Sequence, residues 1–535
     1  MTGLQMHRFP GPDSLGRRPC HSGNRLGRYG LVALLAISLA ACGGESTVSA
    51  PSSEPTLCGN ESVAASQDPV ANPLRSDATA RALPAWYDDA KLGIMIHWGV
   101  WAVPAWAETT LDPERVADPA DPLYLLALPC PPCPGVDNFL RHNPYTEWYE
   151  NSLAIDGTAT QEFHQTKYGA DFPYTAFQPQ FEERAQKWNP AAWARLFAEA
   201  RARYVVFVTK HHDGYTLWPS AVENSQRPGW FWQRDAVGEL ATAVRDRCLR
   251  MGVYYSGGID WSFKPPPIED VYDFADTAPP GPEYANYFEA QYRELIARYQ
   301  PSILWNDITA PGEADLATLF QDFYTAVPDG VVNDRWSGVG ATPPPRDFRT
   351  VEYDVPDQID PEKWETVRGI GRTFGYNSNE RPEDYGTPEK YIHMLIDVVS
   401  KNGNLLLNVG PMADGTIPEQ QVTILQALGA WNSLYGEAIF GTRPWTRHAG
   451  TTDQGIPVRF TQRRDGAVAY ATLLGTPSGP TFTLQDFPEL PASVRLVGSD
   501  KPLAWEAVEG DLRIAVPAAL PAQPAHAFAI ELAAP

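Results

Sequence analysis

Residues 302–308 read Ser302-Ile303-Leu304-Trp305-Asn306-Asp307-Ile308 and join a short apolar run to a tryptophan, an amide and a carboxylate. Apolar runs of this length, bounded by turn residues, fit strands that are buried on both faces. Asp307 then stands where the strand leaves the core and meets solvent, which is the position that carries the chemistry in barrel enzymes. An isolated strand-end aspartate is more often a cap for the next turn, so the rest of the chain decides its role.

The chain before and after this run alternates between helical and strand patterns. Helical periodicity precedes apolar strands several times, and helix-start residues stand where they are expected: Asn189 before Pro190, and Asp235 before the apolar positions of the next helix, with Gly252 as its expected stop. Repeated alternation with continuously apolar strands predicts a parallel sheet covered by helices. The expected helices are 190–200, 237–248, 284–299, 316–326, 388–402 and 418–435.

Polar or aromatic side chains follow the ends of nearly all the predicted strands, which favours a closed barrel. An open doubly wound sheet gathers its ligands at one switch point and usually carries a glycine-rich phosphate loop, and no G-x-G-x-x-G follows the first strand. We therefore predict a closed (β/α) barrel over residues 81–445. The strand-end residues are His97, His211, His212, Tyr254, Asp307, Arg335, Glu352 and Asn408.

The pattern changes near residue 446 to short alternating runs. Asp465-Gly466, between two of these runs, is a hairpin signal. Residues 446–535 are therefore expected to form a C-terminal antiparallel β-sandwich.

The N-terminus has the features of a targeting segment. Arginines precede an apolar run at 31–41 that is too short to span a bilayer comfortably. The run ends in small residues before Cys42, which resembles a bacterial lipobox, although an ordinary secretory signal that happens to contain a cysteine is the alternative. We predict a lipoprotein signal peptide at 1–41, lipidation of Cys42 and a flexible tether at 42–80. The protein is then exported and held at a membrane on the periplasmic or cell-surface side by its lipid anchor.

Charge and cysteine usage narrow the class of partner. The net charge of −23 disfavours nucleic acid and anionic membrane surfaces as partners. Cys130 and Cys133 form a C-x-x-C pair within an apparent insertion at 108–140, and a local disulfide fits an oxidising compartment better than a redox or zinc site. Cys248 stands alone in the sequence, and no partner is predicted for it.

Metal binding is not expected, and no cofactor is predicted. His211-His212-Asp213 contains possible ligands. Neighbouring side chains on a strand point to opposite faces, so only one of them would normally face a given ion.

Two carboxylates at strand ends, Asp307 and Glu352, fit glycoside hydrolysis. That reaction needs one carboxylate to attack or to activate water and one carboxylic acid to protonate the leaving oxygen. The chain has no Gly-x-Ser-x-Gly elbow for acyl transfer and no His-Glu-x-x-His zinc motif.

Several segments resemble the α-L-fucosidases of glycoside hydrolase family 29, in family order, between about 84 and 445. The most specific are KHHDG followed by LWPS within 204–220, and LLLNVGP within 403–418; the others lie at 86–106, 147–149, 252–261, 304–307, 332–336 and 350–353. The resemblance implies a TIM-type barrel with a C-terminal β-sandwich, and a retaining exo-α-L-fucosidase that acts on a fucosylated oligosaccharide or glycoconjugate.

The resemblance also implies roles for individual residues. Asp307 matches the nucleophile and Glu352 the general acid/base, with Asp354 and Glu147 as competitors for the second role. A retaining pair lies about 5–5.5 Å apart, with the nucleophile ionised and the acid protonated. The positions that match fucose-binding residues are His97, Glu147, Trp148, His211, His212, Tyr254, Trp305 and Arg335.

Two departures from the family pattern leave the linkage preference open. Ile308 stands where many relatives have glycine, and the 108–140 insertion borders the Glu147 segment. A barrel glycosidase for another sugar, such as galactose, and a glycan-binding lipoprotein without catalysis are the alternative functions. The natural glycan, its linkage and the oligomeric state are not determined by the sequence.

Overall fold

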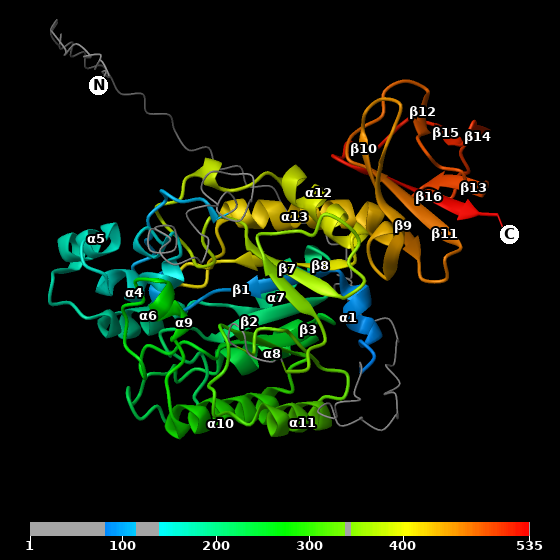
Figure 1. The fold of residues 1–535 in the computed structure, drawn as a ribbon. Helices are drawn as coiled ribbons and strands as arrows, with labels where there is room; N and C mark the ends of the chain where they lie inside the picture. The colour runs from blue at the N-terminus through cyan, green and yellow to red at the C-terminus, as the bar shows by residue number, and fades with distance from the viewer. Residues whose placement is uncertain (1–80, 114–138, 338–343, 534–535) are drawn as a thin grey trace, which may run out of the picture. The chain divides into compact units, whose positions relative to one another are not determined.

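Eight parallel strands form the central sheet of the molecule (Figure 1). The structure is a computed structural model that describes residues 81–113, 139–337 and 344–533. The strands lie in the order β5-β4-β3-β2-β1-β8-β7-β6, and every adjacent pair is parallel. They are β1 (Leu92–Ile96), β2 (Tyr204–Lys210), β3 (Arg250–Ser256), β4 (Ile303–Asp307), β5 (Val331–Val332), β6 (Arg349–Glu352), β7 (Trp364–Gly369) and β8 (Gly403–Val409).

Helices follow most strands and cover the sheet, with α10 and α11 on one side of it and α12 and α13 on the other (Figure 1). Among the described residues of the β5–β6 and β6–β7 connections there is no helix, so the alternation is irregular there. The helices are α1 (Ala85–Ala90), α4 (Tyr149–Ala154), α5 (Ala159–Tyr168), α6 (Gln178–Ala185), α7 (Pro190–Glu199), α8 (Ala236–Arg245), α9 (Val271–Ala275), α10 (Pro282–Tyr299), α11 (Leu316–Ala326), α12 (Pro388–Ser400) and α13 (Glu419–Tyr435).

The predicted helix starts are confirmed at the level of single hydrogen bonds. The Asn189 side chain accepts from the backbone N–H groups of the first turn of α7, and Asp235 accepts from Gly238 N–H at the start of α8. Each cap satisfies a donor that has no partner inside the helix.

The sheet curls into a barrel whose seam lies between β5 and β6. These two strands are not paired as a ladder, but two aspartates bridge them. The backbone N–H of Asp347 donates to the Val332 carbonyl at 2.9 Å, and the Asp347 carboxylate accepts from Val332 N–H at 2.8 Å. Further along, Asp334 accepts from the N–H and the hydroxyl of Thr350. Carboxylates therefore replace ladder carbonyls where β5 is too short to supply them.

A buried carboxyl group organises the barrel interior below the site described next. Glu365 on β7 is fully buried and accepts from Tyr87 at 3.0 Å, Tyr204 at 2.5 Å and the Trp305 indole N–H at 3.0 Å. Gly93 makes room for this layer, because a Cβ there would lie 2.2 Å from the Tyr204 ring. Burial raises the pKa of Glu365 to about 7.

Glu365→Ala is expected to destabilise the fold by roughly 3–5 kcal/mol, because three buried donors lose their acceptor. Glu365→Gln retains an acceptor oxygen of the same size and should cost less than half of that. Denaturant unfolding of the two variants measures the difference. Equal losses in both would show that the carboxyl group matters for its volume and not for its hydrogen bonds.

The C-terminal residues form two antiparallel sheets. One has the order β13-β16-β11-β10-β9 and the other β12-β15-β14. Phe482 and Phe528, one from each sheet, have ring centroids 4.9 Å apart, so apolar faces of the sheets meet. The strands are β9 (Thr442–Thr451), β10 (Pro457–Arg463), β11 (Val468–Leu473), β12 (Thr481–Leu484), β13 (Pro491–Leu496), β14 (Trp505–Val508), β15 (Asp511–Ala515) and β16 (His526–Leu532).

The C-terminal sheets contact the barrel through α12 and α13. Arg459 on β10 pairs with Asp397 on α12, and the Trp431 indole on α13 donates to the Ala525 carbonyl at 3.0 Å. The predicted hairpin at Asp465-Gly466 joins β10 to β11, which confirms that turn. β9 begins at Thr442 and runs across the predicted boundary at 445/446.

Some sequence expectations were wrong. α8 ends at Arg245, and Gly252 lies further on, inside β3, where a Cβ would lie 2.8 Å from the Cβ of Ile303. β7 was not predicted, because the charged Glu365 and Arg368 interrupt the apolar run that a buried strand normally shows. Cys248 does not stand alone: it is disulfide-bonded.

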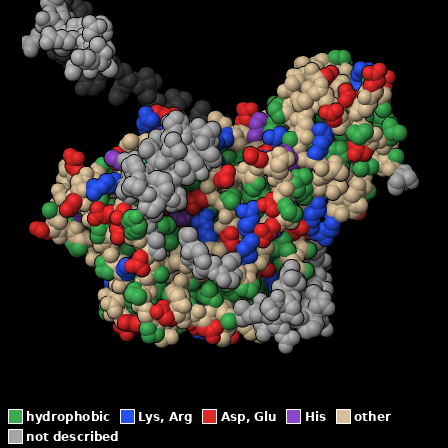
Figure 2. Space-filling model, viewed as in Figure 1, with side chains coloured by type: hydrophobic (Ala, Val, Ile, Leu, Met, Phe, Trp, Pro, Cys, Tyr) green, Lys and Arg blue, Asp and Glu red, His purple; other side chains and the backbone are tan. Residues whose placement is uncertain are grey.

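Several expectations fall outside the described residues: the signal peptide and lipidation at Cys42, the tether, and the pairing of Cys130 with Cys133. Within the ranges that the structure describes, no helix has both the length and the hydropathy of a membrane span. Figure 2 shows acidic and basic side chains interspersed over the visible face.

Candidate active site

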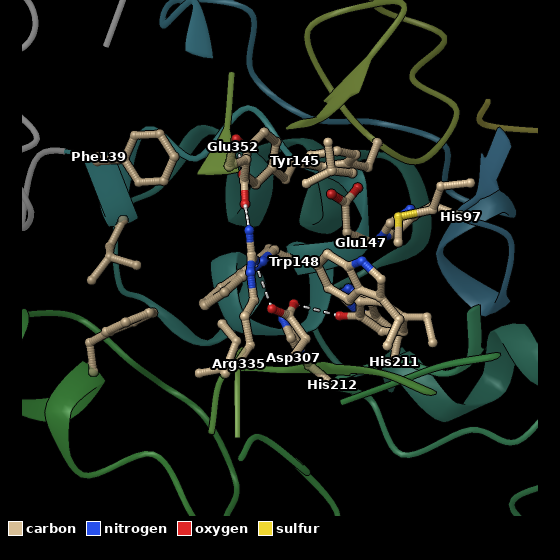
Figure 3. A pocket seen from close by; sticks show the side chains of 18 residues that line it. His97, Phe139, Tyr145, Glu147, Trp148, His211, His212, Asp307, Arg335 and Glu352 are labelled. Carbon is tan, nitrogen blue, oxygen red and sulfur yellow. Dashed lines mark hydrogen bonds and ion pairs between the residues drawn. The ribbon is translucent and has the colours of Figure 1, made fainter. Parts of the chain in front are cut away.

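A cavity of about 380 Å³ opens at the carboxyl ends of the barrel strands (Figure 3). The catalytic pair and every residue that the sequence analysis matched to sugar binding line it. Eight further residues complete the lining, and of these the sequence analysis singled out Ile308 alone, as a departure from the family pattern: Met95, Phe139, Leu140, Tyr145, Phe274, Ile308, Val367 and Phe374.

Asp307 at the end of β4 is held as a charged carboxylate. Arg335 Nη1 lies 2.9 Å from its Oδ1, and the Tyr254 hydroxyl donates to its Oδ2 at 2.7 Å. Burial by itself would raise the pKa of Asp307, but the Arg335 charge and the Tyr254 hydrogen bond help to hold the pKa below its ordinary value. The side chain is 12% exposed, so it is desolvated yet accessible from the cavity.

Glu352 at the end of β6 faces the same guanidinium from the other side (Figure 3). Its Oε2 lies 3.4 Å from Arg335 Nη1, and its Oε1 accepts from the Tyr145 hydroxyl at 3.2 Å. Burial raises the pKa of Glu352, Arg335 opposes the rise and the Asp307 charge adds to it. The two carboxyl groups are therefore tuned in opposite directions, which is the arrangement that an acid and a nucleophile require.

The two carboxylates lie close together, because they share one nitrogen atom. Arg335 Nη1 contacts Asp307 at 2.9 Å and Glu352 at 3.4 Å. The nearest oxygens of the pair cannot be further apart than the sum of these distances. The roughly 5–5.5 Å spacing of a retaining pair falls within that limit.

The backbone turns sharply after each carboxylate. Ile308 has φ 50° and Tyr353 has φ 54°, values that L residues with side chains rarely adopt. Backbone strain of this kind costs about 1–2 kcal/mol at each residue and gathers at functional sites.

Three histidines line the cavity and are held neutral. Burial lowers the pKa of His97 to about 4 and of His212 to about 3, and it lowers the pKa of His211 as well. His97 Nδ1 lies 2.7 Å from Asn408 Oδ1, and His212 Nδ1 lies 2.6 Å from Ser256 Oγ. Nδ1 of His211 is buried and has no hydrogen-bond partner among the described residues.

His211 and His212 both line the cavity, which corrects the expectation that they face opposite ways. β2 ends at Lys210, so the alternation of a strand no longer applies, and the two rings lie 3.9 Å apart. Asp213 turns away and accepts from the Tyr174 hydroxyl. Among the described residues, no group of three or more His, Cys, Asp and Glu side chains is arranged to hold a metal ion.

Glu147 stands on the histidine side of the cavity and is firmly anchored. It accepts from Gly375 N–H at 2.9 Å and from the Thr373 hydroxyl at 3.1 Å. Gly375 has no room for a side chain, since a Cβ would lie 2.4 Å from Thr146 Oγ1. Burial raises the pKa of Glu147 to about 7.

Trp305 forms the floor beneath the carboxylates. The Tyr254 ring stacks on it with centroids 5.4 Å apart, and the Arg335 guanidinium lies 4.7 Å from its centroid. Its indole N–H is fixed by Glu365. The barrel interior therefore sets the positions of Tyr254 and Arg335, the two partners of Asp307.

Asp354, the exposed competitor for the acid role, does not line the cavity, and its carboxylate accepts from the adjacent Val355 N–H. Glu147 does line the cavity. The carboxylate that contacts the same Arg335 guanidinium as Asp307, however, is Glu352.

Comparison with known proteins identifies the family. The family model described as alpha-L-fucosidase matches residues 58–437. The chain belongs to the α-L-fucosidase family. It is a glycoside hydrolase of family 29, as the resemblance of its motifs implied.

Relatives within the α-L-fucosidase family match over most of their length. The tissue alpha-L-fucosidase of Bos taurus is 32% identical over 453 residues, which are 80% of this chain and 82% of that protein. A solved alpha-L-fucosynthase of Thermotoga maritima, in complex with alpha-L-Fuc-(1-2)-beta-L-Fuc-N3, is 41% identical with a TM-score of 0.74 and covers 84% of this chain and 97% of that one. The Thermotoga maritima alpha-fucosidase in complex with fucose is 40% identical with a TM-score of 0.71, over the same shares of the two chains.

Proposed function

We propose that this enzyme is a retaining exo-α-L-fucosidase that releases terminal α-L-fucose through a covalent fucosyl-enzyme intermediate. The observation that carries the proposal is the pair of carboxylates, Asp307 and Glu352, joined by one Arg335 nitrogen within a sugar-sized cavity. Their close spacing supports retention.

In the first step, Asp307 attacks the anomeric carbon of the bound fucose and the bond to the leaving oxygen breaks. Glu352 gives its proton to that oxygen, so the departing group leaves as a neutral alcohol. Arg335 and the Tyr254 hydroxyl keep Asp307 ionised before attack. Asp307 is therefore ionised over the same pH range in which Glu352 keeps its proton. The raised pKa of Glu352 makes its protonated fraction larger than that of a free glutamate.

In the second step, Glu352 takes a proton from water, and the water oxygen attacks the anomeric carbon. The bond to Asp307 breaks, which returns the carboxylate and releases fucose with its original configuration. Arg335 touches both carboxylates, so it balances their changing charges in both steps.

We assign fucose binding to His97, Glu147, Trp148, His211, His212, Tyr254, Trp305 and Arg335, which share the inner part of the cavity. Neutral imidazoles can both donate to and accept from ring hydroxyls. Phe374 and Met95 supply apolar surface for the methyl group of fucose. The complexes of the Thermotoga maritima proteins with fucose and with a fucosyl disaccharide support a fucosylated oligosaccharide or glycoconjugate as substrate.

The test is to follow hydrolysis of an aryl α-L-fucoside by proton NMR and to identify the first anomer released. Retention predicts that α-L-fucose appears first and that the β anomer grows later by mutarotation. If β-L-fucose appears first, the double displacement is wrong. Turnover of an aryl galactoside in preference to the fucoside would favour another sugar, and saturable fucose binding without turnover would favour a lectin-like protein.

Tyr145→Phe is expected to move the basic limb of the kcat/KM profile to higher pH. The Tyr145 hydroxyl stabilises the charged form of Glu352 and so lowers its pKa, and its removal raises that pKa further. The acid must be protonated to act, so activity then persists to higher pH, while the acid limb set by Asp307 stays in place. Tyr385→Phe, outside the cavity, is the matched control. A basic limb that moved to lower pH would contradict the assignment.

We further propose that the protein is exported and anchored through lipidated Cys42, as its N-terminal sequence suggests. Metabolic labelling with a radioactive fatty acid tests this: the unmodified protein should carry label and Cys42→Ser should not. Label that persists in Cys42→Ser would place the acyl group elsewhere.

A further inference from the structure

The cavity has an apolar half that the fucose-binding assignment does not use. We define it by Phe139, Leu140, Phe274 and Ile308, all of which line the cavity. Figure 3 shows Phe139 on the opposite side of Arg335 and Glu352 from His97. The proton donor thus stands between the histidine side and the apolar side. A leaving group departs past the proton donor, so the apolar half lies where that group must sit.

The apolar half is built from three separate segments, which pack onto Trp148, onto Tyr145 and onto a buried cluster that contains Trp148. The Phe274 ring on α9 stacks with Trp148, with centroids 6.5 Å apart and planes at 17°. The Phe139 ring meets Tyr145 edge-on at 5.8 Å. Leu140 belongs to a buried cluster with Trp148 and Trp261, against which Ile308 packs. The surface is therefore fixed in place relative to the reacting atoms.

Ile308 is held in this surface against its backbone preference. It is β-branched and has φ 50°, a conformation that favours glycine. The turn is pinned from behind, because Gly257 N–H donates to the Asp307 carbonyl at 3.1 Å, and a Cβ on Gly258 would lie 1.5 Å from the Ile308 carbonyl oxygen. Glycine at 308 would relieve the strain but leave a gap in the apolar wall. The packing of the Ile308 side chain therefore explains why isoleucine stands at a position where the backbone conformation favours glycine.

Phe274 completes the surface from the solvent side. It is 39% exposed, and it lines the cavity with its ring stacked against Trp148. Its neighbour Tyr272 is 65% exposed and does not line the cavity. The two aromatic residues of one short helix thus provide a test and its control.

We propose that Phe139, Leu140, Phe274 and Ile308 form the leaving-group subsite, which receives the pyranose ring released from fucose. This inference rests on the proposed function. None of the four side chains carries a hydrogen-bonding group, so the subsite recognises the C–H face of the ring by contact and stacking. It favours a ring over a small leaving group and does not read the hydroxyl pattern of that ring, so it accepts several linkages.

The test compares two substrates in the same enzyme. α-L-Fucosyl fluoride has a leaving group too small to reach the subsite, whereas a disaccharide of α-L-fucose on a hexopyranose fills it. We expect the ratio of kcat/KM for the disaccharide to that for the fluoride to fall about three- to tenfold in Phe274→Ala and in Ile308→Gly. The fall should be larger in the double variant. Ile308→Gly relieves backbone strain, so loss of folding does not obscure the result.

Matched controls separate contact from general disturbance. Tyr272→Ala changes an exposed aromatic residue on the same helix, and Thr309→Gly changes the next positive-φ residue, at φ 69°, which does not line the cavity. Neither should move the ratio. A ratio that stays within twofold in both test variants, or that falls equally in the controls, overturns the subsite. An unmodified enzyme that hydrolyses neither substrate overturns the proposed function and the subsite with it, whereas hydrolysis of both with an unchanged ratio overturns the subsite alone.

Discussion

Asp307→Ala is expected to lower kcat/KM for an aryl α-L-fucoside by roughly 10³-fold or more, because removal of a catalytic nucleophile leaves only binding and charge stabilisation. The fold should persist, since Arg335 keeps Glu352 and the Trp305 face as partners. Thermal unfolding of the variant beside the parent checks that point.

Azide distinguishes a lost nucleophile from a disturbed site. The Asp307→Ala cavity has room for this small anion, which can attack the anomeric carbon while Glu352 and the leaving group act as before. We expect azide to restore turnover of an aryl α-L-fucoside and to give β-L-fucosyl azide, since only one displacement then takes place. Wild-type turnover in Asp307→Ala without azide would remove the aspartate from the mechanism. The product of the opposite configuration, α-L-fucosyl azide, would show that another group still performs the first displacement.

Glu352→Ala should have the second largest effect, and its size should depend on the leaving group. General acid catalysis contributes about 10²–10⁴-fold, so a fucosyl disaccharide, whose leaving oxygen needs a proton, should lose about that factor. An activated dinitrophenyl fucoside needs no proton and should lose far less in the first step. The basic limb of the kcat/KM profile should also disappear, because the group with the raised pKa is gone.

Asp354→Ala is the matched control for Glu352→Ala. It removes an exposed carboxylate two residues along the chain that does not line the cavity, so neither substrate should be affected. Equal losses on both substrates in Glu352→Ala would indicate a binding role instead of acid catalysis. In that case Glu147, which also lines the cavity, becomes the candidate acid.

The strand–helix alternation was predictable because its causes are local. β4 and α11 have the expected bounds to within a residue. The signals for such elements, an apolar run or a cap such as Asp315, lie within a few consecutive residues of the chain. β7 was missed because its polar residues are compatible with burial only through partners from β2, β4 and α1. Periodicity cannot show that a glutamate in a strand will be satisfied by two tyrosines and a tryptophan far along the chain.

The site was predictable in part. The polar residues stand at strand ends, and the resemblance to a known family supplied their roles. The apolar half of the cavity carried no such signal: Phe139, Leu140 and Phe274 lie in connecting segments, and apolar residues there look like ordinary packing. Tyr145 carried a partial signal, since it stands two positions before Glu147, but the carboxylate that its hydroxyl contacts is Glu352, far along the chain.

The sequence by itself determined that the chain is a barrel glycosidase with Asp307 and Glu352 at strand ends, because strand periodicity and residue chemistry are local properties. Only the tertiary structure decided that both carboxylates meet at one Arg335 nitrogen and acquire opposite pKa shifts, since charge and desolvation depend on distances across the barrel. The tertiary structure also explains why isoleucine follows Asp307, at a position with positive φ. A residue that the backbone disfavours is retained there because its side chain packs against a buried cluster assembled from other segments.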